Sequence, residues 1–399
     1  MRRIDVNIGI FTDTYYPQVS GVATSIKTLR RQLERLGHTV YVFTTTDPNV
    51  EKNVYEPNIF RFSSVPFISF TDRRIAVRGV FQALQVAREL NLDIVHTQTE
   101  FSLGLIGKFV AKNLKIPCVH TYHTMYEDYL HYVAKGKLLR PVHVKQMSRS
   151  FCQNMSGIVA PSERVLNTLT RYGITAPISV IPTGVDIARF SKKHNTQELR
   201  VKLGLQPNQP VLLTLSRLAF EKDIDKLIAI MPQVFQKITD ARLVIVGDGP
   251  ARQMLEDQVA KLKIADQVIF TGEINNDDVA YYYQMADLFV STSVSESQGL
   301  TYIEALASGL PVLATHSPYT DQLLDDPTLG KTFAQPDELV ADIYQYLAYD
   351  KEYFASSYRK DKLHAISATR FGEAIVDFYD DSMLFYEKHI AGKEPDQIS

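Results

Sequence analysis

The chain has 399 residues, of which 45% are hydrophobic, so it can bury two sizeable cores and two domains are expected. The sequence has no run of eighteen apolar residues, which excludes a predicted membrane-spanning helix, and the N-terminal apolar stretch is too short for a signal peptide and carries Asp5. Cys118 and Cys152 are the only cysteines, a usage that excludes a disulfide framework and indicates a reduced, cytoplasmic protein.

The net charge of −2 conceals an asymmetry between the two halves of the chain. Residues 1–190 carry 23 Lys and Arg against 14 Asp and Glu, whereas residues 191–399 carry 20 against 31. A basic first half indicates that this half meets a negatively charged surface. Nucleic acid and anionic lipid both fit that charge, but no recognised nucleic-acid-binding module is present.

The first half alternates apolar runs of strand length with amphipathic helical patterns. One example is the helical pattern at 22–36, which stops before Gly37, a residue type that favours the position after a helix. We expect strands at 6–11, 38–44, 94–96, 117–121, 157–161 and 178–181, and helices at 22–36, 76–90, 103–113 and from residue 162.

The second half repeats this alternation after a polar stretch at 195–208, which we interpret as part of a join between two units. We expect strands at 211–216, 243–246, 268–271 and 288–291, and helices at 222–238, 251–262, 276–285 and about 371–389. Strand and helix in turn, with short links, predict parallel sheets with right-handed crossovers.

Two successive units of this kind predict an α/β protein with two Rossmann-like, doubly wound domains that face each other across a cleft. We expect a first domain over residues 1–190 and a second over 200–370. The last amphipathic helix, about 371–390, is expected to pack back on the first domain.

The stretch from Val290 to Val312 joins a β-branched run, a turn of small polar residues and a helical pattern ending at Gly309. Glu296 falls in the turn and Glu304 inside the helix. A strand, a glycine-bearing turn and a helix N-terminus form an anion site, because the first N–H groups of a helix have no partner within it. By itself the pattern fits two ordinary residues equally well. Glu296 would then interact with the dipole of the helix from its first turn, and Glu304 would be a solvated residue within the helix.

Other polar residues also follow predicted strands, at the sheet edge where α/β proteins bind ligands. Gly21 lets a phosphate or sugar approach the backbone closely, although it also fits a simple turn. His123 is a candidate hydrogen-bond donor or proton carrier, although a structurally satisfied histidine is commoner. Arg217 and Lys222 are placed to converge on a diphosphate, or are two solvated cations.

Gly247, Asp248, Gly249 and Pro250 form half of a dinucleotide-binding fingerprint. Arg252 stands where the third glycine of that fingerprint belongs, so the cofactor signature fails. The four residues are still consistent with a tight turn near a nucleotide.

Taken together, these residues resemble the retaining glycosyltransferases of the GT4 family, which have the GT-B fold. The pair Glu296 and Glu304 resembles the E-x7-E motif of that family, and Arg217 with Lys222 matches its SR-x4-K arrangement. Four longer stretches are similar to the diacylglycerol glucosyltransferases of low-GC Gram-positive bacteria, which make the glycolipid anchor of lipoteichoic acid: 11–26, 96–104, 120–129 and 296–309. One departure is Ser20-Gly21, where many GT4 members have two glycines.

The resemblance implies that Glu296 holds hexose hydroxyls, Glu304 binds the ribose, and Arg217 and Lys222 neutralise the leaving diphosphate of a UDP-sugar. It also implies that His123 contacts the transferred sugar, and that the acceptor attacks on the face from which UDP departs. Neither a bound cofactor nor a metal site is expected, and stimulation by Mg²⁺ is left open. The further donor contacts that it implies are Gly21, Gly247, Gly249, Ile274, Gln298, Gly299, Leu300 and Thr301.

A basic and apolar stretch indicates where a membrane would be met. Residues 130–161 contain no acidic residue, and apolar side chains are interleaved with the cations, a composition that suits the plane of an anionic membrane. A second candidate contact is the apolar run at 65–70 with the arginines after it. Solvated cations beside core residues explain the pattern equally well. The residues assigned to the membrane or acceptor are Lys135, Lys137, Arg140, Lys145, Arg149, Phe67, Arg73 and Arg74.

The sequence therefore favours a peripheral enzyme on the cytoplasmic face of the membrane that transfers glucose from UDP-glucose to diacylglycerol with retention. Three alternatives stay open. One is a GT4 enzyme that extends a glycolipid with galactose or a second glucose, and another is one that uses a soluble glycan. The third is a non-catalytic membrane-binding scaffold, against which Arg217, Lys222, Glu296 and Glu304 argue.

Overall fold

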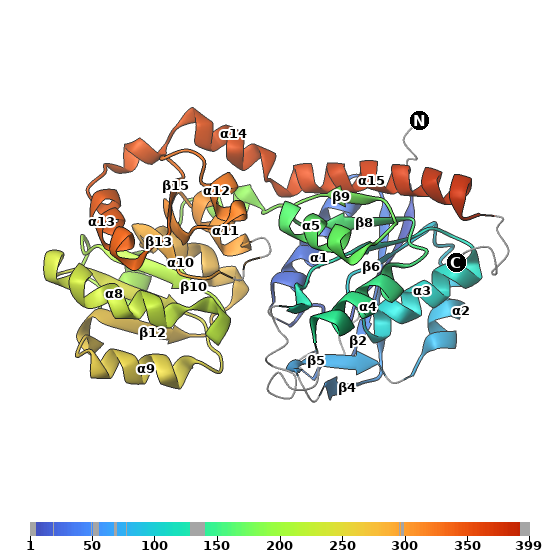
Figure 1. The fold of residues 1–399 in the computed structure, drawn as a ribbon, viewed down its shortest axis with the longest axis horizontal. Helices are drawn as coiled ribbons and strands as arrows, with labels where there is room; N and C mark the ends of the chain where they lie inside the picture. The colour runs from blue at the N-terminus through green and yellow to red at the C-terminus, as the bar shows by residue number, and fades with distance from the viewer. Residues whose placement is uncertain are drawn as a thin grey trace. The chain divides into compact units, whose positions relative to one another are not determined.

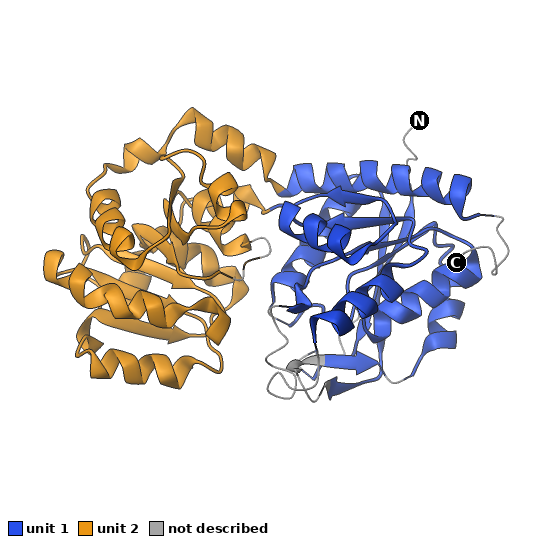
Figure 2. Cartoon of the chain, in the orientation of Figure 1, with its two compact units in different colours: residues 1–184, 368–399 blue, residues 185–367 orange. Residues whose placement is uncertain are grey.

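The computed structural model describes residues 5–18, 20–48, 50, 56–67, 70–76, 78–127, 140–294, 296 and 299–391. The chain divides into two compact units, which are coloured separately in Figure 2. Unit 1 comprises residues 1–184 and 368–399, and unit 2 comprises residues 185–367. Each unit is built from a parallel sheet with helices on both faces (Figure 1).

Unit 1 contains a seven-stranded sheet, a two-stranded hairpin and six helices within the described residues. Its strands are β1 (Asn7–Phe11), β2 (Thr39–Thr45), β3 (Ile59–Phe62), β4 (Ser64–Phe67), β5 (Phe70–Ala76), β6 (Ile94–Thr97), β7 (Cys118–Thr121), β8 (Gly157–Ala160) and β9 (Ile178–Val180). Its helices are α1 (Gly21–Arg35), α2 (Val80–Glu89), α3 (Ser102–Leu114), α4 (Pro141–Cys152), α5 (Glu163–Tyr172) and α15 (Ala368–His389).

The large sheet of unit 1 is parallel throughout, with strand order β3-β2-β1-β6-β7-β8-β9. Alternate residues of each strand enter cores on opposite faces, as the period of two in a strand requires. Ile8 and Ile10 of β1 pack on the core that α1 and α15 cover, whereas Phe11 packs on the core that α2 to α5 cover. Strand order reverses between β1 and β6, which makes this the switch point of the sheet.

Helix α15 belongs to unit 1 although it comes last in the chain. Ile375 and Tyr379 are buried in the same core as Ile8 and Leu29, and the helix packs beside α1. Gly157 of β8 allows this approach, because a β-carbon there would lie 2.8 Å from the Phe378 ring.

The predicted helix at 76–90 is wrong at its start. Residues up to Ala76 form β5, which pairs antiparallel with β4, and the helix begins only at Val80. Gly79 marks the change, because it adopts a left-handed conformation with φ of 113° and precedes the first helical residue.

Unit 2 is contiguous in sequence and holds a six-stranded sheet. Its strands are β10 (Val211–Leu215), β11 (Arg242–Val246), β12 (Val268–Gly272), β13 (Leu288–Ser291), β14 (Val312–Thr315) and β15 (Gly330–Phe333). Its α-helices are α6 (Ile187–Ser191), α7 (Gln197–Lys202), α8 (Ile224–Lys237), α9 (Arg252–Lys261), α10 (Val279–Met285), α11 (Leu300–Ala307), α12 (Pro318–Leu323), α13 (Pro336–Leu347) and α14 (Ser357–Ala365).

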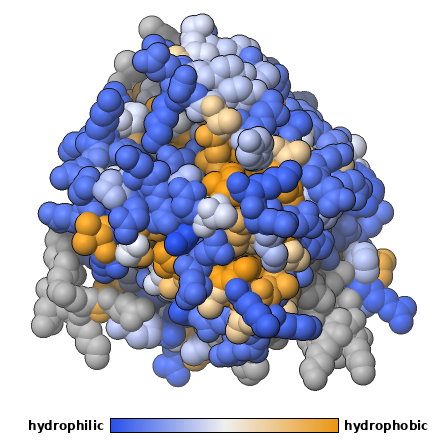
Figure 3. All heavy atoms as spheres, turned by 90° about the vertical axis from the view of Figure 1, so that its left-hand side faces the viewer, coloured by the Kyte–Doolittle hydropathy of each residue, from blue (hydrophilic) through white to orange (hydrophobic). Residues whose placement is uncertain are grey.

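The sheet of unit 2 is also parallel throughout, with order β12-β11-β10-β13-β14-β15. Leu212 faces one core, with α8, α9 and α13, while Val211 and Leu213 face the other, with α10 and α11. Its switch point lies between β10 and β13. Figure 3 shows a face of unit 2 on which apolar residues gather near the middle and hydrophilic residues surround them.

The prediction of two doubly wound parallel sheets is confirmed. The polar stretch at 195–208 lies within unit 2 and contains α7. No element was predicted between residues 313 and 367, where the structure has β14, β15 and helices α12 to α14.

Candidate active site

Polar side chains gather at the switch point of unit 2, where the loops after β10 and β13 come together. The side chain of Thr292, just after β13, donates a 2.7 Å hydrogen bond to the carbonyl of Asp223. Asp223 ends a short 3-10 turn at Phe220–Lys222 and has φ of 50°. The fold therefore brings the stretch that carries Arg217 and Lys222 against the stretch that carries Glu296.

Lys222 and Glu296 form an ion pair across these two loops. Lys222 Nζ lies 2.5 Å from Glu296 Oε1, and the two side chains are only 17% and 19% exposed. Partial burial strengthens the attraction between the charges relative to water. A cation and a carboxylate are thus held together at the carboxyl edge of the sheet, 74 residues apart in sequence.

Arg217 has a different partner from Lys222. Its guanidinium donates to Glu221 at 3.0 Å, and the arginine is 44% exposed whereas the glutamate is 8% exposed. The buried carboxylate therefore orients a guanidinium that stays accessible to solvent. The structure brings Lys222 to Glu296 directly, and it places Arg217 on the same β10 loop beside the second carboxylate.

Gly247 and Gly249 are explained by the approach of this same loop. A β-carbon on Gly247 would lie 2.0 Å from the carbonyl oxygen of Ser216, and one on Gly249 would lie 2.4 Å from that of Leu218. Both glycines have positive φ, at 126° and 158°. Leu218 N–H donates to the carbonyl of Asp248 at 2.9 Å, which completes the contact. The glycine turn thus holds the Arg217 loop in place.

Gly299 precedes helix α11 and has φ of 56°, a conformation that glycine adopts without strain. Leu300 and Thr301 follow as the first two residues of the helix, where backbone N–H groups have no partner within the helix. Gln298 lies outside the described residues. Ile274 lies after β12 and packs against the α10–α11 core.

Glu304 lies inside α11 and is bonded to α10. The hydroxyl of Tyr283 donates to Glu304 Oε2 at 3.0 Å. Burial raises the pKa of Glu304 to about 7, although the hydrogen bond from Tyr283 and the charge of Arg189 oppose that shift. The carboxyl is therefore poised to change its charge near neutral pH.

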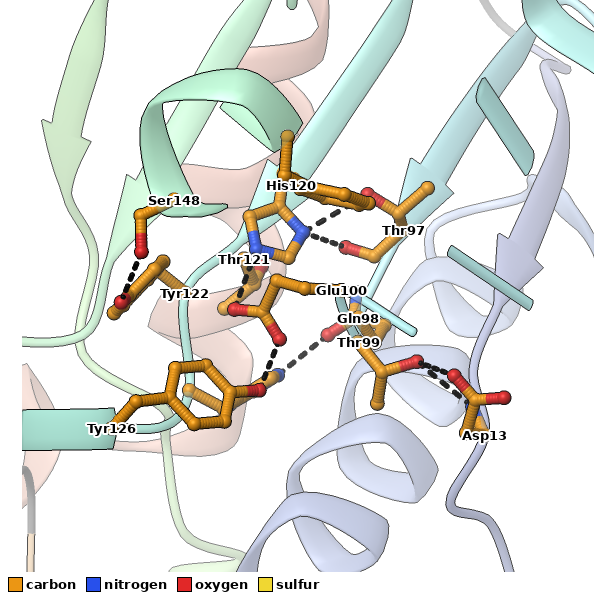
Figure 4. A network of polar contacts seen from close by, with 12 residues as sticks. Asp13, Thr97, Gln98, Thr99, Glu100, His120, Thr121, Tyr122, Tyr126 and Ser148 are labelled. Atoms are coloured by element: carbon orange, nitrogen blue, oxygen red, sulfur yellow. Dashed lines mark hydrogen bonds and ion pairs between the residues drawn. The ribbon is translucent and has the colours of Figure 1, made fainter. Parts of the chain in front are cut away.

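A second polar network occupies the switch point of unit 1, after β1 and β6 (Figure 4). The buried carboxylate of Asp13 accepts hydrogen bonds from Thr99 Oγ1 at 2.7 Å, from the Leu103 N–H at 3.1 Å and from the hydroxyl of Ser102. Two of these donors belong to the first turn of α3, so Asp13 fixes the start of that helix.

His120 and Glu100 form the buried centre of this network. His120 Nε2 lies 3.2 Å from Glu100 Oε1, and the hydroxyl of Tyr126 donates to the other oxygen of the carboxylate. Burial alone would raise the pKa of Glu100, but the hydrogen bonds from His120 and Tyr126 bring that pKa below its ordinary value. The glutamate is thus an ionised anchor in the interior.

The three histidines expected at strand ends have different environments. His96 and His120 are fully buried and bonded through both ring nitrogens, which assigns them to the structure of the unit. His123 is partly exposed, and its Nε2 lies 2.7 Å from Gln98 Oε1. Gly21 is exposed at the start of α1, with open space where a β-carbon would stand.

Comparison with known proteins agrees with this geometry. Residues 19–189 match the model of Glycosyltransferase Family 4, and residues 195–360 match that of Glycosyl transferases group 1. The chain is 47% identical to the alpha-monoglucosyldiacylglycerol synthase of Streptococcus pneumoniae over 95% of its length and 86% of the relative. It is 35% identical to the protein of the same name from Acholeplasma laidlawii, over 84% of this chain and 86% of that one.

The chain belongs to glycosyltransferase family 4. Its fold is GT-B, as expected. The Anabaena protein Alr3699/HepE, solved in complex with UDP-glucose, superposes with a TM-score of 0.74 at 18% identity, over 94% of this chain and 99% of that one.

The basic residues assigned to the acceptor side of this glycosyltransferase lie in two places. Arg140 precedes α4, and Lys145 and Arg149 lie on it, with Val142 exposed beside them. Arg74 of β5 instead donates to Ser64 across the hairpin at 2.8 Å. Lys135, Lys137 and the side chains of Phe67 and Arg73 lie outside the described part of the chain.

Within its described residues the glycosyltransferase has no group of three or more His, Cys, Asp or Glu side chains arranged to hold a metal ion. None of the described helices is long and apolar enough to cross a membrane.

Several polar residues of these networks were missed as individual candidates. Asp13, Gln98 and Glu100 all follow directly after predicted strands, which was the signal that could have identified them. Glu221 stands between the two clamp cations in sequence, but only the structure shows that it is buried against Arg217.

Proposed function

We propose that this glycosyltransferase transfers glucose from UDP-glucose to diacylglycerol and forms α-monoglucosyl-diacylglycerol with retention. The observation that carries the proposal is the 47% identity to an alpha-monoglucosyldiacylglycerol synthase over nearly the whole of this chain. The second relative of that name is matched over 84% of the chain. Both units are included in these matches, so donor and acceptor parts are expected to correspond.

Unit 2 would bind the donor at its switch point. Arg217 and Lys222 would meet the diphosphate, Glu296 the hexose hydroxyls, and Glu304 the ribose hydroxyls. The ion pair between Lys222 and Glu296 supports this assignment, because it holds one group for phosphate and one for sugar at a spacing of 2.5 Å. When the donor binds, Lys222 would exchange its contact with Glu296 for the diphosphate, and Glu296 would exchange Lys222 for the hexose.

The chemical contribution of these residues would be electrostatic. Negative charge grows on the diphosphate as the glycosidic bond breaks, and fixed cations at that position stabilise the charge without reorganising. Glu296 would orient the hexose so that the acceptor hydroxyl attacks the face that UDP leaves. A phosphate oxygen would accept the proton of that hydroxyl. His123, oriented by Gln98, would contact the transferred sugar from unit 1.

Unit 1 would meet the membrane that contains the acceptor. Helix α4 buries Val144, Ser148 and Phe151 and turns Arg149 to solvent with Val142, which is 60% exposed. Cations and apolar groups on one exposed helix face favour binding in the plane of an anionic bilayer.

Helices α2 and α3 also carry exposed apolar side chains that could contact a membrane. Phe81 of α2 is 80% exposed and packs edge-on against Phe109 of α3, and Leu105 of α3 is 57% exposed. Lys108 of α3 donates to the carbonyl of Gln153 at the end of α4 at 3.3 Å, which ties α3 to α4. Apolar side chains of three adjacent helices are thus available for contact with lipid on the cytoplasmic face of the membrane.

A screen of donors and acceptors tests the reaction. Vesicles that contain diacylglycerol or glucosyl-diacylglycerol are incubated with UDP-glucose or UDP-galactose, and lipid products are identified by mass spectrometry, with the anomeric configuration read by NMR. We expect α-monoglucosyl-diacylglycerol from UDP-glucose and diacylglycerol. A product only from glucosyl-diacylglycerol or only from UDP-galactose would replace the proposal with one of the alternatives.

The Glu296→Gln variant is the matched control for this screen, because it keeps the size of the side chain and removes its charge. We expect it to stay folded and to lose at least about a hundredfold in turnover, as for the removal of a group that acts in the transition state. Turnover equal to that of the wild type would contradict the donor site.

A further inference from the structure

Tyr319 carries a buried hydroxyl that has no hydrogen-bond partner within the described part of the chain. It is the second residue of α12, which follows β14 at the carboxyl edge of the unit 2 sheet. Its ring keeps some exposure, whereas the oxygen at its tip is inaccessible to solvent. A buried polar group without a partner destabilises the folded protein, so this hydroxyl requires an explanation.

The ring of Tyr319 borders Gly299, the residue before α11. A β-carbon added to Gly299 would lie 3.2 Å from Cε1 of Tyr319, so the ring edge is adjacent to that glycine. Burial, and then the nearby carboxylate of Glu296, raise the pKa of Tyr319, so the phenol is neutral and able to donate. The ring of Tyr319 thus lies beside the residue that precedes α11, and the charge of the proposed hexose anchor acts on its hydroxyl.

Other buried tyrosines around α11 have partners for their hydroxyls. Tyr302 is 2.9 Å from Ser291 Oγ, and Tyr283 donates to Glu304 at 3.0 Å. The missing partner is therefore not a general property of this part of the core. The rings of Tyr302 and Tyr319 both lie beside Gly299, but of these two only Tyr319 has a hydroxyl without a partner within the described residues.

We propose that Tyr319 donates a hydrogen bond to an oxygen of the hexose in the bound sugar nucleotide. This inference rests on the proposed donor site. A neutral phenol and the Glu296 carboxylate form a complementary pair, because one donates to a sugar oxygen and the other accepts from a sugar hydroxyl. The diphosphate already has two cations in Arg217 and Lys222, whereas Glu296, the described side chain of unit 2 assigned to the hexose, only accepts hydrogen bonds. This hydrogen bond would form with UDP-glucose but not with UDP, because UDP has no hexose.

The Tyr319→Phe variant tests this assignment, with UDP-glucose and UDP titrated calorimetrically in the absence of acceptor. We expect UDP-glucose to bind roughly three- to tenfold more weakly, as for one hydrogen bond, and UDP to bind as tightly as it does to the wild type. The melting temperature should equal or exceed that of the wild type, because the substitution removes an unpartnered buried hydroxyl. The control is Tyr346→Phe in the same unit, whose hydroxyl donates to the carbonyl of Pro327 at 3.1 Å.

Tyr346→Phe should lower the melting temperature and leave both titrations unchanged, which is the behaviour of a purely structural hydroxyl. The same result for Tyr319→Phe would overturn the inference. Equal weakening of UDP and UDP-glucose would overturn it as well, because the contact would then belong to the nucleotide. A wild-type protein that binds neither UDP nor UDP-glucose would refute the proposed function itself, and the Tyr319 assignment with it.

Discussion

The ion pair between Lys222 and Glu296 has a consequence for the proposed donor site. Their side chains are mostly buried, so each charge would be unfavourable there without the other. Donor binding must supply a new partner for both charges. Removing one residue should therefore change both the affinity for the donor and the stability of unit 2.

Lys222→Met is expected to weaken UDP binding by about ten- to a hundredfold, as for the loss of a hydrogen bond to a charged group. Titration of UDP measures this change. The control is Lys226→Met, because Lys226 lies four residues further on, is paired with Asp223 and is 57% exposed. Equal losses in the two variants would mean that general positive charge, and not the position of Lys222, attracts the nucleotide.

Glu304 gives a prediction for pH. Its pKa is about 7 in the folded protein, raised mainly by burial from an ordinary value of 4.5. The folded state therefore retains a proton that the unfolded state loses, and this residue lowers stability progressively as pH rises from about 4.5 to 7. We expect the difference in melting temperature, Glu304→Gln minus wild type, to become more positive as the pH rises from 5 to 7.5. A difference independent of pH would contradict the shifted pKa.

At the residue scale, the sequence marked candidate site residues but did not predict which residues they contact. The E-x7-E and SR-x4-K spacings marked Glu296, Glu304, Arg217 and Lys222, whose proposed roles stay predictions. The ion pair of Lys222 joins residues 74 positions apart, and the bond from Tyr283 to Glu304 spans two helices. Such contacts depend on the order of the strands in the sheet. The periodicity of apolar residues in the sequence predicts individual strands and helices but not that order.

The turn at 247–250 shows how one element fixes another. Its two glycines let its backbone contact the loop that carries Arg217, so their role is to position a neighbouring loop, independently of any direct contact with a nucleotide. The half fingerprint in the sequence predicted a tight turn at this place but not the reason for its glycines, and its nearness to a nucleotide stays a prediction.

Gly247→Ala is expected to destabilise unit 2 and to displace the Arg217 loop, because the new β-carbon meets the Ser216 carbonyl at 2.0 Å. The matched control is Gly309→Ala, where φ is 97° but nothing lies within 4 Å of the added carbon. Both variants carry the backbone penalty of about 1–3 kcal/mol. Chemical unfolding should therefore show a greater loss for Gly247→Ala, accompanied by weaker UDP binding. Equal losses would show that the loop contact is unimportant.

Elements with strong periodicity were predicted well, and those with mixed signals were not. The buried parallel strands β1, β6 and β13 are continuous apolar runs, and each lies within a residue or two of its predicted range. The hairpin β4–β5 was missed, because short strands with arginines between apolar residues show no clear period. Helices α12 and α14 are short, and tertiary packing rather than propensity stabilises them.

At the scale of the whole molecule, the charge asymmetry of the sequence follows the two units only in part, because the acidic segment 368–399 belongs to unit 1 together with the basic residues 1–184. Unit 1 presents cations and exposed apolar side chains on α2, α3 and α4. If unit 1 carries the membrane contact, attachment should depend on these cations and not on the total charge of the chain.

Arg140, Lys145 and Arg149 changed together to Glu should reduce sedimentation with anionic vesicles, since each cation near such a surface contributes about 1 kcal/mol. The control changes three exposed lysines of unit 2, Lys202, Lys261 and Lys360, to Glu, which alters the net charge equally. UDP binding should be normal in both variants. Equal sedimentation of the two would reject the α4 surface as the membrane contact.

The return of α15 to unit 1 bears on how the protein is made. During translation, residues 1–184 emerge first, but the helix that covers Ile8 and Leu29 follows only after all of unit 2 has been synthesised. At typical translation rates this delay is roughly 10–40 s. Unit 2 is contiguous in sequence, so all of its residues are synthesised one after another without such a delay. Unit 2 therefore has the means to fold before unit 1 is complete, and during this interval Ile8 and Leu29 lack the cover that α15 later provides.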